Sequence, residues 1–232
     1  MNKKIKMFII FIVFALIISC KNDVNGKALE TSEQSLEIPK QIEQEIKKEF
    51  NGLLNILETK DLSKLDEEDT KEIEKKIKEL KETIEKTDVK KTPLKTYSEY
   101  EEKVKEIREK LKDKFKDKKE LEGKLKELEE SLKKKKEERK QALQEAKKKF
   151  EEFQNQVNTA TGVTTGQRAG NQGTIGVQAF KCVKEFGLSV SSSSKNGTDT
   201  SDMSKGIIDD ALKQINEELK NNGEEAVEEK KE

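Results

Sequence analysis

The feature that most constrains this chain is a set of apolar residues that recur every three or four positions in an otherwise charged sequence. Charged residues make up 41% of the chain and aromatic residues only 5%. Spacings of three and four place side chains on one face of a helix, and no stretch of useful length alternates as a strand would. The sequence therefore predicts an all-α fold in which each helix buries one narrow face against a neighbour.

Two helices are predicted in the first part of the chain. The first carries Ile42, Ile46, Phe50, Leu53 and Leu57. We expect it to start with Pro39 in its first turn, where proline is tolerated. The second carries Ile73, Ile77, Leu80 and Ile84. It follows a turn at residues 60–66, with Ser63 or Asp66 as its N-cap, and ends before Pro93 because the residue ahead of a proline resists helical geometry.

The longest helical pattern covers residues 98–157 and opens with a capping box at Ser98–Glu101. Its apolar seam holds Val104, Ile107, Leu111, Leu121, Leu125, Leu128 and Leu132, and the same seam positions also include Lys114, Lys118, Lys135 and Arg139. One continuous helix would be about 90 Å long. Such a helix would protrude, pair with another copy as a coiled coil, or fold back. We favour a fold-back with its break at residues 117–120, just ahead of Gly123.

The last third of the chain alternates between polar and helical segments. Residues 158–176 are rich in Gly, Thr, Asn and Gln and nearly uncharged, which predicts a long polar loop. A short helix through Val177 and Phe186, a second polar loop at 189–202 and a final helix through Ile207 and Leu219 follow. Residues 222–232 are predicted to be an acidic, disordered tail. The fold predicted for residues 39–221 is an elongated antiparallel helical bundle with a coiled-coil-like long helix and flexible termini.

The N-terminus has the features of an export signal. Three lysines precede an apolar run at residues 7–18, which is too short to cross a bilayer core as a helix. The run ends in Ile17-Ile18-Ser19-Cys20, which resembles a bacterial lipobox. This implies that residues 1–19 are a lipoprotein signal peptide and that Cys20 is acylated, anchoring the protein to a membrane. Residues 20–38 would form a lipidated flexible tether. The alternative is an ordinary signal peptide with a cysteine nearby by chance.

The side-chain inventory argues against an enzyme. The chain has no histidine, which removes the commonest general base and imidazole metal ligand. With Cys20 acylated, Cys182 is the only remaining thiol, so it cannot form an intramolecular disulfide or a multi-cysteine zinc site. We expect a half-buried small apolar residue there, with a reactive or intermolecular thiol as the alternative. No cofactor, metal or catalytic residue is predicted, and the default is a non-enzymatic binding protein.

A local excess of positive charge marks the long helix. Residues 101–150 hold 20 Lys or Arg and 14 Asp or Glu. The candidate binding residues are Lys133, Lys134, Lys135, Lys136, Arg139, Lys140, Lys147, Lys148 and Lys149. They predict either a solvated helix face with i,i+4 ion pairs or a patch that attracts glycosaminoglycans or acidic proteins. Nucleic acid is not expected, because the signal peptide directs the chain out of the cytosol.

Two parts of the chain resemble known lipoproteins. The leader from Met1 to Asn22 resembles that of the OspE/OspF-related (Erp) surface lipoproteins of Borrelia spirochetes. The body is similar in pattern to the Rev lipoproteins of the same genus, over residues 97–154 and in the passage from Gly187 through Asp202-Met203-Ser204-Lys205 to the final helix. The body differs from Erp proteins, and the polar segment 158–176 is longer than the Rev pattern leads us to expect.

The resemblance implies a lipid-anchored protein of the outer membrane, exposed on the cell surface and active in host interaction and virulence. Its partner would be a host plasma or matrix protein, with fibronectin associated with Rev and complement factor H with related helical lipoproteins. No short binding motif can be transferred to this chain. The alternative function is a structural envelope lipoprotein that self-associates as a homodimer through a coiled coil at residues 98–157.

Overall fold

The computed structural model describes residues 34–115, 118–190 and 200–221, apart from the side chains of residues 34–38 and Ser63. The described residues from Glu37 onward belong to one compact unit. All regular structure in the described residues is helical, which confirms the predicted all-α bundle. The α-helices are α2 (Gln34–Thr59), α3 (Glu67–Glu85), α4 (Leu94–Leu111), α5 (Lys119–Thr159), α6 (Thr165–Glu185) and α7 (Thr200–Lys220), with single 3-10 turns η1 (Leu62–Lys64) and η2 (Lys112–Lys114).

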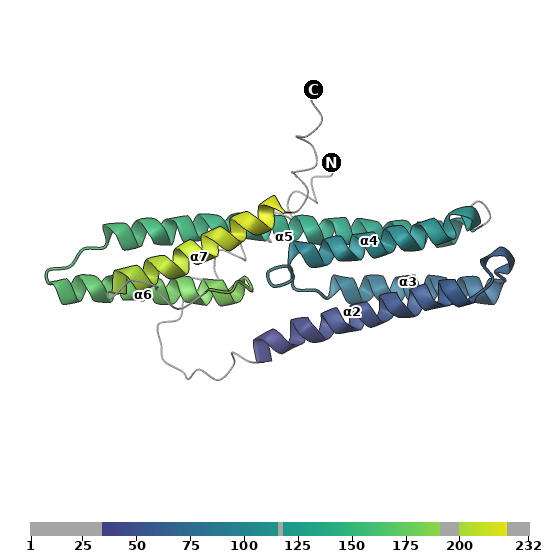
Figure 1. Cartoon of the computed structure of the whole chain (residues 1–232), viewed down its shortest axis with the longest axis horizontal. Helices are drawn as coiled ribbons and strands as arrows, with labels where there is room; N and C mark the ends of the chain where they lie inside the picture. Colours follow the sequence, from purple (N-terminus) through teal and green to yellow (C-terminus); the bar gives the residue numbers. More distant parts are fainter. Residues whose placement is uncertain (1–33, 116–117, 191–199, 222–232) are drawn as a thin grey trace, which may run out of the picture. The chain divides into compact units, whose positions relative to one another are not determined.

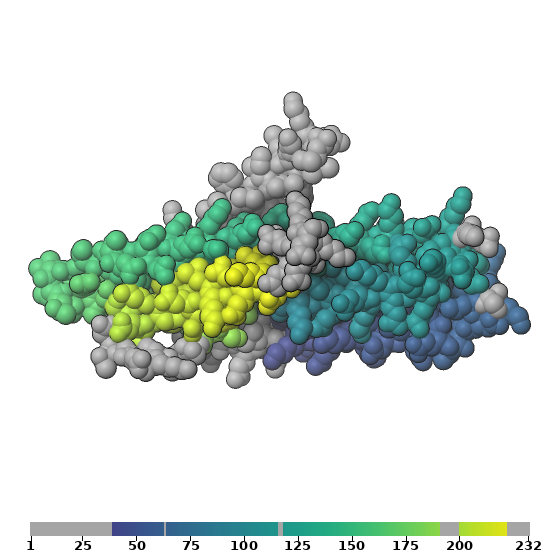
Figure 2. All heavy atoms as spheres, turned by 45° about the horizontal axis from the view of Figure 1, so that its top comes forward, coloured from purple at the N-terminus to yellow at the C-terminus, as the bar shows by residue number. Residues whose placement is uncertain are grey.

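Successive helices from α2 to α6 run in alternating directions, as predicted for an antiparallel bundle (Figure 1). The last helix departs from this rule, because α7 runs in the same direction as α6. The contacts agree: Gly173 of α6 approaches Thr200, and Gly176, one turn later, approaches Ser204. Figure 2 shows α7 in yellow lying along α5, against which it packs.

The long pattern folds back on itself, as favoured from the sequence. Helix α4 ends at Leu111 and α5 begins at Lys119, so the break starts earlier than the predicted residues 117–120 and overlaps them only at its end. The two helices are held side by side by Arg108, which forms a bidentate ion pair with Glu129 at 2.6 Å and 3.0 Å. The seam residues from Val104 to Leu132 are therefore buried within one chain.

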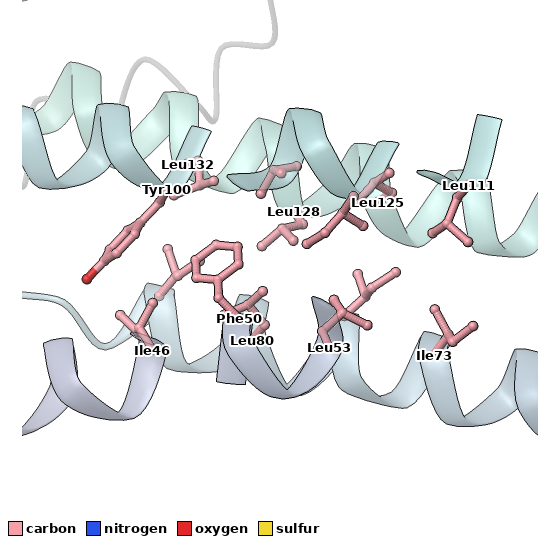
Figure 3. Packing of buried hydrophobic residues seen from close by; sticks show 14 of the residues in the cluster. Ile46, Phe50, Leu53, Ile73, Leu80, Tyr100, Leu111, Leu125, Leu128 and Leu132 are labelled. Carbon is pink, nitrogen blue, oxygen red and sulfur yellow. The ribbon is translucent and has the colours of Figure 1, made fainter. Parts of the chain in front are cut away.

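The first hydrophobic cluster lies between α2, α3, α4 and the first half of α5 (Figure 3). The predicted periodic residues form it: Ile46, Phe50 and Leu53 of α2 face Ile73 and Leu80 of α3 and the leucines of α5. The Phe50 and Tyr100 rings pack at 5.5 Å between centroids. Asp66 is the N-cap of α3, as predicted, and accepts a hydrogen bond of 2.8 Å from the Asp69 amide.

The second cluster lies between the second half of α5, α6 and α7. It consists of Leu94, Ala142, Leu143, Ala146, Phe150, Val157, Ala179, Cys182, Val183, Phe186, Ile208, Ala211 and Ile215. Helix α5 has 41 residues and is about 60 Å long. Its first half therefore packs in the first cluster and its second half in the second cluster.

The predicted loop at residues 158–176 is wrong, because α6 begins at Thr165 and includes the Gly-rich segment. Two of these glycines, Gly173 and Gly176, lie close to α7. A Cβ atom added to Gly176 would lie 2.3 Å from the Ser204 Oγ atom, so only glycine permits this approach of α6 to α7. The Ser204 hydroxyl donates to the Gln172 carbonyl at 2.9 Å and thereby joins the two helices.

Other predicted boundaries also shift. Helix α2 starts at Gln34, within the predicted tether 20–38, and Pro39 lies inside it; the missing proline N–H costs one helical hydrogen bond there. Helix α4 starts at Leu94, so Ser98 is an interior residue whose hydroxyl donates to the Leu94 carbonyl at 3.2 Å and is not an N-cap. Residues 200–202 of the predicted loop 189–202 are helical. The leader with Cys20, residues 191–199 and the acidic tail 222–232 lie outside the described residues.

The glycine packing can be tested with two substitutions in one helix. Gly176→Ala should lower the free energy of unfolding by about 1–3 kcal/mol, because the added methyl group overpacks the α6–α7 contact. Gly170→Ala is the matched control: a Cβ there meets nothing within 4 Å, so alanine should raise stability by about 0.5–1 kcal/mol. Urea unfolding followed by circular dichroism measures both. Equal effects of the two substitutions would contradict the packing assignment.

Candidate functional site

The nine predicted binding residues all lie on α5, but their surroundings differ. Lys133, Lys134 and Lys148 are exposed, Lys135, Lys136, Lys140, Lys147 and Lys149 are partly buried, and Arg139 is buried. The nine side chains therefore do not form one uniform basic surface.

Arg139 is not a surface binding residue, which corrects the prediction. Its residue is only 1% exposed, because its seam position on α5 faces inward. The guanidinium forms a bidentate pair with Glu218 of α7, from Nε to Oε1 at 2.9 Å and from Nη2 to Oε2 at 2.8 Å. Its Nη1 atom donates to the backbone carbonyls of Lys90, Val89 at 3.4 Å and Phe186 at 3.2 Å. All of the charged donors are thus directed into the protein.

Glu218 extends this arrangement to the start of α4. Its Oε1 atom also accepts a hydrogen bond of 2.8 Å from the Leu94 amide. Pro93 is the N-cap residue of α4, and its side chain makes no capping hydrogen bond. The Glu218 carboxylate of α7 accepts from a backbone amide at this helix terminus instead. Negative charge is favoured at that position because helix N-termini carry partial positive charge.

The C-terminal end of α6 also contacts the Arg139 guanidinium. Gly187 adopts φ +64°, and the Leu188 amide donates to the Val183 carbonyl at 2.9 Å, which closes the helix with a Schellman-type turn. A Cβ atom at Gly187 would lie 3.0 Å from the Lys91 Cα atom. The left-handed turn therefore brings the α6 terminus against the α3–α4 connection, where Phe186 presents its carbonyl to Arg139.

Lys135 is also partly structural. Its Nζ atom donates to the Thr87 carbonyl at 3.1 Å, and burial lowers the pKa of this lysine. The Thr87 hydroxyl lies 2.8 Å from the Tyr97 hydroxyl, and burial raises the pKa of Tyr97. Lys135 therefore supports the α3–α4 connection one turn before Arg139.

Nearby carboxylates and rings engage several of the other lysines. Lys136 pairs with Glu101 of α4 at 2.7 Å, and Lys134 lies 3.8 Å from Glu138. The Lys149 ammonium lies 5.5 Å from the centre of the Phe186 ring. The exposed remainder of the predicted site is centred on Lys133, Lys134 and Lys148.

A shallow groove of about 500 Å³ lies between α3 and α5 and includes Lys134 and Lys135 in its lining. Its lining is Lys81, Glu85, Glu127, Glu130, Ser131, Lys134, Lys135 and Glu138. Lys81 and Glu127 pair across it at 2.9 Å. Because both signs of charge alternate along its walls, the groove does not concentrate a potential of one sign.

The described residues contain one thiol, that of Cys182. They contain no group of three or more His, Cys, Asp or Glu side chains arranged to hold a metal ion. Cys182 is buried in the second cluster, 4% exposed, rather than half-buried as predicted. No helix among the described residues has the length and apolarity needed to span a membrane.

The sequence argument missed Glu218, which completes the buried ion pair. Arg139 did give a signal, because it falls seven residues after Leu132 and seven before Ala146, on the seam that leucines occupy elsewhere. A charged residue at such a position needs a buried partner. Nothing in the sequence around Glu218, which is one of many glutamates, identifies it as that partner.

The fold and the side chains together define an all-α bundle whose most elaborate polar arrangement is structural. No family model matches the chain, no curated protein matches its sequence, and no solved structure matches its fold.

Glu218→Gln tests the buried ion pair. The substitution leaves the Arg139 charge buried without its counter-charge, so the free energy of unfolding should fall by about 3 kcal/mol. Urea or thermal unfolding measures the loss.

The neighbouring Glu217→Gln is the matched control. Glu217 forms an exposed pair with Lys213 at 4.0 Å, and its substitution should change stability by less than about 0.5 kcal/mol. Similar losses for both variants would show that the Arg139–Glu218 pair has no special role.

Proposed function

We propose that this chain is a lipid-anchored outer-surface protein that binds a host plasma or extracellular-matrix protein and catalyses no reaction. The observation that carries the proposal is the leader, in which lysines, the apolar run at 7–18 and Ile17-Ile18-Ser19-Cys20 occur in the order of a lipoprotein signal. The resemblance to Borrelia surface lipoproteins supports fibronectin or complement factor H as the first partners to test.

The described bundle suits a binding role. Helices packed around two continuous clusters provide a rigid support, so a partner can be bound without a large ordering cost. Lys133, Lys134 and Lys148 remain exposed for an acidic protein surface or a sulfated glycan. Contacts of this kind mainly accelerate association and depend on ionic strength.

The alternative function, a coiled coil between copies through residues 98–157, is less well supported. The seam leucines that a partner helix would need, from Leu111 to Leu132, are buried against α2, α3 and α4 of the same chain. Pairing through that seam would require the first cluster to open.

The anchor is tested by Cys20→Ala in cells fed with labelled palmitate. The variant should incorporate no label and should move from the detergent phase to the aqueous phase, because acylation requires the thiol. Substituting Cys182 with alanine is the control and should leave labelling unchanged. Label on the Cys20→Ala protein would overturn the lipoprotein assignment.

Partner binding is tested by passing host serum, purified fibronectin and factor H over immobilised residues 21–232. We expect one of these to be retained. Replacing Lys133, Lys134 and Lys148 with glutamine should weaken retention about tenfold at low salt and abolish its dependence on ionic strength. A variant with Lys71, Lys75 and Lys78 of α3 replaced by glutamine makes the same change in charge and should bind normally. Retention of nothing from serum would refute the binding function, whereas equal losses in both variants would refute only the lysine site.

A further inference from the structure

One segment of this highly charged chain is almost free of charge. Residues 154–180 contain a single ionisable side chain, Arg168, although 41% of the whole chain is charged. In the structure they form the end of α5, the α5–α6 turn and most of α6. A surface there presents amides, hydroxyls and apolar groups.

The exposed apolar residues gather in the same region. Among the described residues the large hydrophobic side chains that remain exposed are Val163 at 94%, Val177 at 58%, Met203 at 53% and Phe180 at 38%. Three of them, Val177, Phe180 and Met203, belong to the α6–α7 pair; we call these three the α6–α7 strip. The other large apolar residues of the described helices are buried in the two clusters or partly buried against them.

Helix geometry places the strip on one side of the α6–α7 contact. Gly176 faces Ser204, and the two helices run in the same direction. Each residue advances a helix by about 100°, so the residue after Gly176 and the residue before Ser204 turn toward the same side. These residues are Val177 and Met203. Phe180, three residues beyond Val177, lies on that side too.

The strip is rigidly supported. Gly176 and Ser204 hold the helices in close contact, and a Cβ atom on Gly173 would lie 3.0 Å from the Thr200 methyl group. The Lys184 ammonium lies 4.8 Å from the centre of the Phe180 ring and gives the strip a charged edge. An uncharged centre with Phe and Met and a polar edge is the composition of a protein–protein interface. The connecting residues 191–199 contain no apolar side chain that could complement it.

We propose that the α6–α7 strip is a self-association surface, and that it binds the same strip of a second copy of this chain. A charged partner surface would lose its water here without meeting an opposite charge. The matching surface must therefore be uncharged at its centre, and the three apolar side chains of the strip itself meet this requirement. A two-fold axis brings Val177, Phe180 and Met203 of one copy against the same residues of the other.

The interface is small, so the dimer is weak. Three partly exposed apolar side chains on each copy bury less area than a standard specific interface, so we expect weak association, with a dissociation constant of about 100 µM in solution. The association depends little on salt, because its centre contains no ion pair.

The test uses residues 21–232, which include the whole compact unit. Sedimentation equilibrium from about 10 µM to about 1 mM should show a monomer–dimer equilibrium. Val177→Lys places like charges together across the two-fold axis and should raise the dissociation constant at least about tenfold. Gln178→Lys adds the same charge to the adjacent residue, which is exposed but turned away from the strip, and should leave the dissociation constant unchanged.

Thermal unfolding of both variants shows whether each remains folded, which is expected because both positions are exposed. A wild-type protein that stays monomeric up to about 1 mM overturns the proposal. So does a dimer that both lysine variants weaken equally or that neither weakens. Dissociation of the dimer at high salt would also overturn the proposal, because it would show that charged residues hold the two copies together.

Discussion

The architecture depends on one buried ion pair between Arg139 and Glu218. The α3–α4 connection, the end of α6 and the last turns of α7 meet beside α5 at the boundary of the two hydrophobic clusters. Backbone groups at helix ends have no helical partners and must be satisfied when buried. In the planar guanidinium of Arg139, Nε and Nη2 donate to the Glu218 carboxylate, and the two N–H groups of Nη1 are shared among the carbonyls of Val89, Lys90 and Phe186. Glu218, in turn, caps α4 through the Leu94 amide.

The two clusters around this pair are packed by different means. The first fills the space between helices with large side chains, such as Phe50 against Tyr100, and the second brings α6 and α7 together through Gly173 and Gly176. Interaxial distance follows the size of the residues at the contact. A buried ion pair contributes little net stability compared with such packing, because its desolvation is costly. We therefore infer that Arg139 and Glu218 mainly specify how the two clusters join.

The sequence predicted the parts of the fold that depend on local patterns. The spacing of Ile46, Phe50 and Leu53 identified a buried face, Asp66 was one of two candidate caps, and the length of the pattern at residues 98–157 favoured the fold-back. The helix that begins at Thr165 was missed because Gly, Thr and Asn have low helix propensity. Glycine is favourable at positions 173 and 176 because α7 packs closely against them. Arg139 was assigned to the surface by its charge. Its heptad position indicated burial, but its partner, 79 residues away, could be found only in three dimensions.

Many of the charged side chains form ion pairs within the chain. Lys136–Glu101 and Lys81–Glu127 connect different helices of one chain, and Lys90–Glu185 connects the α3–α4 connection to α6. Ion pairs that remain in contact with water add little stability individually, but unlike charges favour one register of neighbouring helices, as they do in coiled coils. A surface occupied by such pairs is poorly suited to exclude water on contact with another molecule. The strip of Val177, Phe180 and Met203 is apolar at its centre, so desolvating these three side chains leaves no charge unpaired. A dry contact therefore costs less there than on a surface occupied by ion pairs.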